Sequence, residues 1–447
     1  MSLQSLLEKD FTDIINEHIT RLDIQSVPVR MNMAVDVGTS KTRALPFAFS
    51  KESNSINAKQ IIKIPNKFAK LNASDLRDVM NLEFEEANLM NMMCITLENT
   101  TNGACPLYKK PVTVSKGLLS DKLLKNSGFS VSNTMKVLQE EEFIINTYSI
   151  IVASIYANVV YFLEQGEVEK ARDSLNVELN LAYMLPDEEK LDEMTAKLYK
   201  ALQGTVEFSI PTMNELKGRF TIRNNAPHQW LDLYGEAESV IYYFLTKHPE
   251  ERYRKAFANH GVSVIDVGEG SVDIVFFKEK ELMDRASDTN REVNGLTLIN
   301  RTLKNVRNKA TKEGKFFRPA VESIKAVLES DSADLILETP SGEIDIADCL
   351  TDAKKEIAAE IANIFKNTFE QNTVLGLDRL FLIILAGRTM TDSEKSPSLG
   401  IYIAERLAEQ LMIPKDICKL THPDSNLIGS ALKLFIKMKK FSQGTAR

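Results

Sequence analysis

The stretch AVDVGTSKTRALPF, residues 34–47, is an apolar run that ends in an aspartate and a glycine, crosses small hydroxyl residues and resumes as a second apolar run. The stretch VIDVGEGSVDIVFF, residues 264–277, repeats this pattern, so that Asp36 corresponds to Asp266 and Gly38 to Gly268. Each copy predicts a hairpin whose tip exposes backbone N–H groups with little side-chain bulk in the way. Such a tip can bind an anion.

Neither copy has the features of other nucleotide-binding loops. A Walker loop needs GxxxxGK[ST] followed by a helix, whereas here the chain continues as strand, and no GxGxxG fingerprint is present. A single strand that ends in Asp-x-Gly indicates only a turn. Two copies indicate two hairpins that grip a polyphosphate, with Asp36 and Asp266 holding a hydrated magnesium ion and the glycines allowing backbone donors to approach the phosphates.

Composition excludes several classes of protein. The 447 residues are 43% hydrophobic and 26% charged, which predicts a soluble protein with two or more lobes. The formal net charge of −7 predicts no direct contact with nucleic acid, so that any contact with DNA would run through a partner. The four cysteines have no CxxC spacing and the histidines form no HxxxH pair, which predicts a cytoplasmic protein without structural zinc.

Two further segments have helical patterns. Residues 144–163 are uncharged, but polar side chains interrupt them and acids flank them, so they predict a helix buried between layers rather than a membrane span. The N-terminal thirty residues predict an amphipathic helical extension, because apolar residues recur at helical spacing at Leu3, Leu6, Leu7, Phe11, Ile14 and Ile15.

Three later segments fit an ATP site. Residues 379–390 predict a buried strand that breaks at Ala386 and Gly387, where ligands bind in α/β sheets. Residues 425–435 predict an apolar helix in which Gly429 allows close packing. Residues 235–245 predict a helix whose first turn holds Glu236 and Glu238.

This order of elements resembles the superfamily of actin, sugar kinases and heat-shock chaperones, over essentially residues 31–440. The segment ESIKAVLES, 322–330, also looks like the adenine-side helix of the chaperones. Within the superfamily the chain resembles bacterial actin-like proteins of the plasmid-segregating ParM type, because it ends soon after the closing helix and no substrate-binding domain follows. The resemblance implies a two-lobed α/β actin-like (ribonuclease H-like) ATPase fold, with a nucleotide cleft between the lobes and a smaller subdomain inserted in each.

The resemblance also implies site residues. Asp36 and Asp266 would bind Mg²⁺ through water, and Glu236 would orient the attacking water, with Glu238 as the alternative. Asp273 would be a supporting acid. Residues implied to contact ATP are Gly38, Thr39, Ser40, Arg43 (or Lys41), Gly268, Gly270, Ser271, Glu322, Lys325, Gly387 and Arg388.

The expected organisation follows the same map. The domains expected are an extension (1–30), a lobe I core (31–50 and 126–258) with its subdomain (51–125), a lobe II core (259–301 and 373–425) with its subdomain (302–372), and a closing helix with a basic tail (426–447).

Three functions remain open at this stage. The first is a filament-forming ATPase of the bacterial cytoskeleton that segregates plasmid DNA, with further copies of itself and a DNA-binding adaptor as partners. The others are a regulatory, chaperone-like ATPase and a small-molecule kinase of the same superfamily. Actins usually have paired glycines at the adenosine loop, whereas Arg388 follows Gly387 here, so the choice between ATP and GTP stays open.

Overall fold

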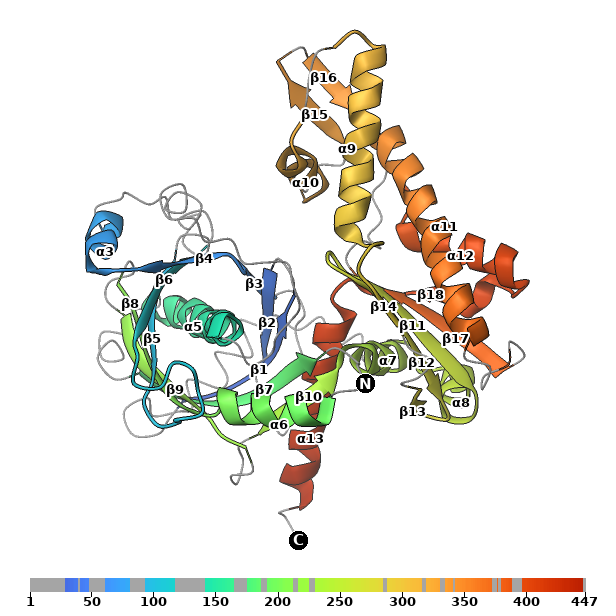
Figure 1. Cartoon of the computed structure of the whole chain (residues 1–447). Helices are drawn as coiled ribbons and strands as arrows, with labels where there is room; N and C mark the ends of the chain where they lie inside the picture. The colour runs from blue at the N-terminus through green and yellow to red at the C-terminus, as the bar shows by residue number, and fades with distance from the viewer. Residues whose placement is uncertain are drawn as a thin grey trace. The chain divides into compact units, whose positions relative to one another are not determined.

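A computed structural model of the whole chain forms two compact units, each with its own sheet and core (Figure 1). The first contains residues 1–186, 190–243 and 426–447, and the second contains 187–189 and 244–425. The structure describes residues 29–38, 41–47, 61–80, 93–116, 141–164, 175–185, 191–211, 216–224, 230–283, 288–315, 319–329, 334–340, 342–371, 376, 379–387 and 396–444. The N-terminal extension predicted from the sequence therefore lies outside the described residues, except for its last two.

The first unit is built on a ten-stranded sheet with the order β3-β2-β1-β7-β9-β8-β5-β6-β4, with β10 also paired to β7. Its strands are β1 (Val29–Val37), β2 (Lys41–Phe47), β3 (Ile62–Pro65), β4 (Phe68–Leu71), β5 (Cys94–Asn99), β6 (Val112–Lys116), β7 (Leu175–Leu185), β8 (Gly204–Ile210), β9 (Leu216–Ile222) and β10 (Leu231–Gly235). Its helices are α3 (Ala73–Met80), α5 (Glu141–Glu164), α6 (Leu191–Leu202), α13 (Ser425–Gly444) and the first part of α7 (Glu236–Lys247).

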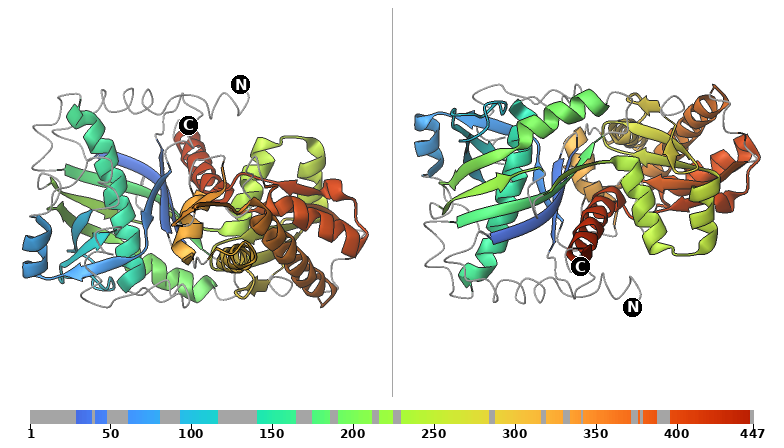
Figure 2. Two further views of the ribbon diagram at one scale, coloured as in Figure 1. Left: turned by 90° about the horizontal axis from the view of Figure 1, so that it is seen from above. Right: turned by 90° about the horizontal axis from the view of Figure 1, so that it is seen from below.

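The sheet of the first unit curves around α5, as Figure 1 shows, and α5 runs across its strands in both views of Figure 2. Apolar residues of α5 pack against residues of β1 to β9 in one core. The predicted buried helix is confirmed over residues 143–155, where every side chain is buried, as expected for a helix without a polar face. Among the residues described, no helix is both long enough and apolar enough to cross a membrane.

The opposite face of the same strands is covered by α13. Ala34 and Met184 belong to a second core with α13, whereas their neighbours Val35 and Tyr183 face the core of α5. This alternation is the period of two that a strand imposes on its side chains. Both faces of β1 and β7 are therefore buried, which explains why the sequence shows a continuous apolar run there.

The second unit holds a six-stranded sheet with the order β13-β12-β11-β17-β18, with β14 paired to β12, and a separate hairpin of β15 and β16. Its strands are β11 (Gly261–Val267), β12 (Val272–Lys278), β13 (Glu281–Leu282), β14 (Asp288–Asn290), β15 (Ile336–Thr339), β16 (Gly342–Asp345), β17 (Leu380–Ala386) and β18 (Cys418–Leu420). Its helices are α8 (Glu251–Asn259), α9 (Gly295–Lys312), α10 (Val321–Glu329), α11 (Ala347–Gln371), α12 (Leu399–Leu411) and the short 3-10 helix η6 (Lys415–Ile417).

Helices cover both faces of this second sheet. Phe276 contacts Phe365 and Phe369 of α11, whereas the adjacent Phe277 contacts Phe257 of α8. Because consecutive strand residues point to opposite faces, α8 and α11 lie on opposite sides of β12. This is the layered α/β arrangement that the sequence predicts.

The two units share one connectivity. In the first, β1 and β2 form a hairpin, β7 and then β10 add in parallel, α5 and α6 precede these two strands, and α7 follows. In the second, β11 and β12 form the hairpin, β17 and β18 add in parallel, α11 and α12 precede them, and α13 follows. The repeat seen in the sequence is therefore a repeat of the whole core, with insertions of different size.

Candidate functional site

The first turn joins β1 to β2 in the manner that the sequence predicts. The Gly38 N–H donates to the carbonyl oxygen of Lys41 at 3.1 Å, which closes a four-residue turn. The register pairs Asp36 with Arg43 and Val37 with Thr42. Thr39 and Ser40, which were predicted to contact phosphate, lie outside the described residues.

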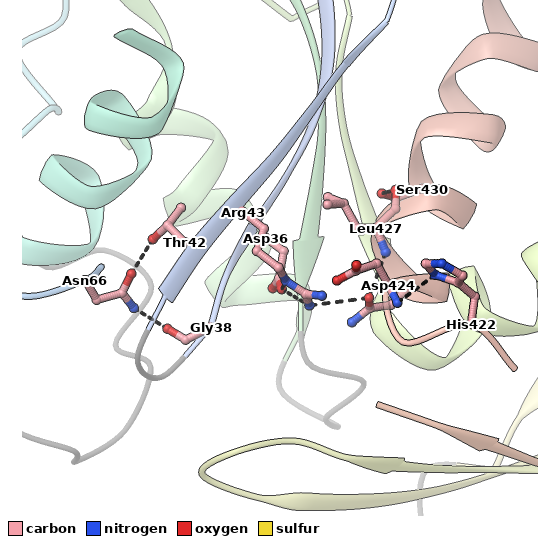
Figure 3. Close-up of polar contacts among 10 residues, drawn as sticks. Asp36, Gly38, Thr42, Arg43, Asn66, His422, Asp424, Leu427 and Ser430 are labelled. Atoms are coloured by element: carbon pink, nitrogen blue, oxygen red, sulfur yellow. Dashed lines mark hydrogen bonds and ion pairs between the residues drawn. The ribbon is translucent and has the colours of Figure 1, made fainter. Parts of the chain in front are cut away.

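Asp36 is bound to the arginine opposite it (Figure 3). Arg43 Nε donates to Asp36 Oδ2 at 2.8 Å, and a second guanidinium nitrogen of Arg43 donates to the same oxygen. That nitrogen also lies 3.4 Å from Oδ1 of Asn426, near the start of α13. Because the Asp36 and Arg43 side chains are only 4% and 12% exposed, the pair holds the guanidinium in a fixed position beside the turn.

An asparagine that the sequence did not suggest supports this turn. The Asn66 amide donates to the carbonyl oxygen of Gly38, and Asn66 Oδ1 accepts from the Thr42 hydroxyl (Figure 3). Asn66 follows β3 and is only 4% exposed. One amide therefore ties the turn to the second strand of the hairpin.

The second turn, between β11 and β12, has the same register. Asp266 pairs with Asp273 and Val267 with Val272, and the Gly268 N–H donates to Ser271 O at 2.9 Å. Each residue number in the second turn is 230 higher than that of its counterpart in the first turn. The difference lies opposite the aspartate, where Asp273 stands in place of Arg43.

Asp273, the predicted supporting acid, accepts two hydroxyl hydrogen bonds. The Ser271 hydroxyl donates to Oδ2 at 3.0 Å, and the Thr289 hydroxyl of β14 donates to Oδ1 at 2.7 Å. Asp273 therefore holds the last residue of the turn in place.

The start of α9 binds three successive carbonyl groups of the second turn. Gly268 O accepts from Gly295 N at 2.9 Å, Glu269 O from Leu296 N at 3.0 Å, and Gly270 O from the Asn294 amide at 3.1 Å. In a trans peptide the C=O and N–H groups point in opposite directions. The N–H groups of residues 269 to 271 therefore point to the side of the turn away from α9, which is the geometry of a backbone anion site.

Gly387 lies against Asp266 at the end of β17. Its φ is +105°, and a Cβ atom built there would lie 2.7 Å from Asp266 Oδ1 and closer still to the carbonyl oxygen of Val267. Only glycine satisfies both demands. The structure therefore brings two predicted site residues together, whereas Arg388 lies outside the described residues.

Glu236 is the first residue of α7, and its charge acts on the same phenol as the charge of Asp36. Burial raises the pKa of Tyr183 well above its ordinary value, and the nearby carboxylates of Asp36 and Glu236 act in the same direction. The alternative residue, Glu238, forms a 2.6 Å ion pair with Lys433 of α13. Within the first unit, Glu236 is thus the acid that shares a neighbourhood with Asp36.

The residues predicted on the adenine side lie on α10. Lys325 forms an ion pair with Glu269, so this lysine lies beside the turn between β11 and β12. Glu322, one helical turn earlier, is exposed. The sequence did not suggest this contact, because nothing local relates α10 to the turn.

No family model matches the sequence, and no curated protein matches it. Solved structures do match the fold. The crystal structure of the actin-like protein Alp7A is similar with a TM-score of 0.63 and 15% identity, over 94% of this chain and 100% of that chain. This chain has an actin-like fold.

Two further matches are ParM proteins. A Bacillus thuringiensis ParM solved with ATP has a TM-score of 0.55 at 13% identity, over 91% of this chain and 99% of its own. A 15-stranded ParM filament from Clostridium botulinum has a TM-score of 0.51 at 14% identity, over 92% and 99%. The actin-like fold that the order of motifs predicted is therefore confirmed, and it resembles that of ParM.

Proposed function

We propose that this actin-like protein is a nucleotide-dependent, filament-forming ATPase. The observation that carries the proposal is the second turn, whose three carbonyl groups are bound by the start of α9 so that the N–H groups of residues 269 to 271 point together to the other side. A row of fixed N–H groups in a glycine-rich turn is suited to the phosphates of ATP. The ParM of Bacillus thuringiensis, solved with ATP, supports the same ligand.

The first turn would contribute a charge to phosphate binding. Arg43 holds its guanidinium beside the turn through its bonds to Asp36, and a planar fork of donors suits both a carboxylate and a phosphate. The predicted contacts of Gly38, Gly268, Gly270, Ser271, Gly387 and Lys325 with the nucleotide belong to the same proposal.

Magnesium fits this donor set as an ion bound mainly by water and phosphate. Asp36 and Asp266 are buried acids, each next to the last residue of its strand. Among the described residues, no three His, Cys, Asp or Glu side chains gather as a ready-made cation site. Mg²⁺ retains several waters and is bound by one or two carboxylates together with substrate phosphates. Bound there, the ion would neutralise charge that develops on the phosphates.

The hydrolytic water would be oriented by Glu236. The helix dipole favours a carboxylate at the first residue of a helix, and carboxylate oxygens can accept a hydrogen bond from water. Its role would be to hold the nucleophile in line, which requires a fixed position.

Assembly of this chain into filaments would give the hydrolysis of ATP a function, namely to time the release of subunits. A ParM filament of this fold is known from Clostridium botulinum, which supports self-association of this chain. In our proposal the chain assembles in its ATP state and is released in its ADP state. Segregation of plasmid DNA in the cytoplasm, through a DNA-binding adaptor, is the corresponding cellular role.

The test measures hydrolysis and assembly in one sample. Purified protein at tens of micromolar is mixed with ATP, ADP or no nucleotide, each with and without Mg²⁺, and followed by phosphate release, light scattering and electron microscopy. We expect filaments above a critical concentration with Mg²⁺–ATP, which disassemble as ATP is consumed. Hydrolysis without assembly would instead favour the kinase or the regulatory ATPase, and absence of both would refute the proposal.

A further inference from the structure

Asn294 uses all the hydrogen-bonding capacity of its side chain at the start of α9. Its Oδ1 accepts from Thr297 N at 2.9 Å and lies 3.1 Å from the Thr297 hydroxyl, whose shorter hydrogen bond goes to Glu292 O at 2.7 Å. Its amide nitrogen donates to Gly270 O at 3.1 Å and to Arg291 O at 2.7 Å. The residue is only 6% exposed, so these four contacts account for its polar atoms.

Capping of the helix does not by itself require an asparagine. Serine, threonine or aspartate at this position would also accept the hydrogen bond from Thr297 N. Donation to Gly270 O requires a donor group that reaches it. An ionised aspartate has no donor, and the hydroxyl of the shorter serine side chain does not extend as far. The presence of asparagine at position 294 therefore indicates a second role, which is to hold the turn between β11 and β12.

The three peptide groups of the second turn are not held in the same way. Backbone N–H groups of Gly295 and Leu296 bind the first two carbonyls, and no substitution except proline removes these donors. The third carbonyl, of Gly270, accepts from a side chain. Because Gly270 has no Cβ atom, its peptide group has wide rotational freedom, and the Asn294 amide fixes the direction of the Ser271 N–H.

We infer that Asn294 is a positioning residue that fixes the second phosphate turn in the orientation that binds phosphate. This inference rests on the proposed function. The contact of the Asn66 amide with Gly38 O shows that the first turn is held by the same kind of group.

The experiment separates the amide that holds the turn from the cap of the helix. Asn294→Ser keeps an oxygen for the cap and removes the donors to Gly270 O. Thr297→Val removes a hydroxyl from the cap side and leaves the amide in place. The matched control is Asn72→Ser, since Asn72 accepts from Ser74 N and Asp75 N before α3, in the other unit.

The readout is the affinity for Mg²⁺–ATP, ADP and adenosine by calorimetry, with thermal unfolding of each variant. We expect Asn294→Ser to weaken ATP binding about tenfold and to leave adenosine binding unchanged, because a buried carbonyl loses its donor. Thr297→Val and Asn72→Ser should bind ATP like the wild type. A specific loss for phosphate-containing ligands is not expected from a merely structural role.

Three results would overturn the inference. They are wild-type ATP affinity in Asn294→Ser, an equal loss in Thr297→Val, or a loss that extends equally to adenosine. If Asn294→Ser unfolds, Asn294→Asp retains the cap and should weaken ATP binding further, because a carboxylate then faces Gly270 O. A wild-type protein that binds no ATP would refute the proposed function, and this result is read before any variant is compared.

Discussion

Replacing Gly387 by alanine should displace Asp266 and slow ATP hydrolysis by more than the loss of stability explains. A Cβ atom at residue 387 would lie 2.7 Å from Asp266 Oδ1, whereas ordinary contacts lie at 3.4–4 Å. The end of β11 must therefore move away from β17 by about 1 Å to restore a normal contact. The carbonyl oxygen of Val267 would lie closer still, and because it is backbone no side-chain rotation can clear it, so the end of β11 moves and Asp266 moves with it.

The structure offers a matched control for the strain of the glycine conformation. Gly342 has φ +108°, close to the +105° of Gly387, and a Cβ atom there would have nothing within 4 Å. Gly342→Ala should therefore lower the free energy of unfolding by roughly 1–2 kcal/mol through backbone strain alone. Gly387→Ala should add roughly 1–3 kcal/mol for the forced contact.

The assay compares steady-state ATP hydrolysis by the two variants well below their melting temperatures. Misplacement of a reacting group by 1 Å can lower a rate on the order of a hundredfold, so Gly387→Ala should be slower by about that factor. Gly342→Ala should retain the wild-type rate. Equal rates in the two variants would refute the reasoning that the close approach at Gly387 positions Asp266 for the reaction.

The remaining predictions test the other groups. Asp266→Ala should lower Mg²⁺-dependent hydrolysis on the order of a thousandfold while circular dichroism shows an intact fold, and unchanged turnover would remove the aspartate from the site. Glu236→Ala should slow hydrolysis yet bind ATP and form longer-lived assemblies, whereas Glu238→Ala, which breaks only the ion pair with Lys433, should turn over normally; the reverse pattern would exchange their roles. Burial lowers the pKa of Lys116 from 10.5 to about 7, so the folded state binds the proton less tightly than the unfolded state. Stability should therefore rise between pH 7 and 10.5 by up to roughly 1.4 kcal/mol per pH unit from this group, and Lys116→Met should flatten the rise in urea titrations; parallel curves would contradict the assignment.

The hairpins and the buried helix were predictable because their signals are local. Apolar runs on both sides of Asp-x-Gly predict two paired strands and their turn, and the structure has this pairing in both copies. Residues 144–163 show no polar face, and a helix without a polar face must be covered on all sides. In both cases the neighbouring residues alone determine the environment.

The supporting groups were not predictable because their partners are distant in the sequence. Asn66 and Asn294 are single asparagines with no recurring pattern, and each becomes significant only where the fold brings it to a turn carbonyl. The ion pair of Lys325 with Glu269 likewise joins α10 to a turn more than fifty residues earlier. Such contacts depend on long-range packing, which a pattern of residue types does not encode.

The two copies of the hairpin differ in one position that divides their proposed tasks. Directly opposed residues of an antiparallel pair lie on the same face, so Asp36 is neutralised by Arg43, whereas Asp266 shares its face with a second acid, Asp273. A cation is attracted most strongly where two carboxylates gather and least where a guanidinium already binds one of them. We therefore propose that Asp266 contributes more than Asp36 to magnesium binding, and that the fixed guanidinium beside the first turn suits an additional phosphate charge. The two turns share one register, and the residue opposite the aspartate gives each turn a different charge.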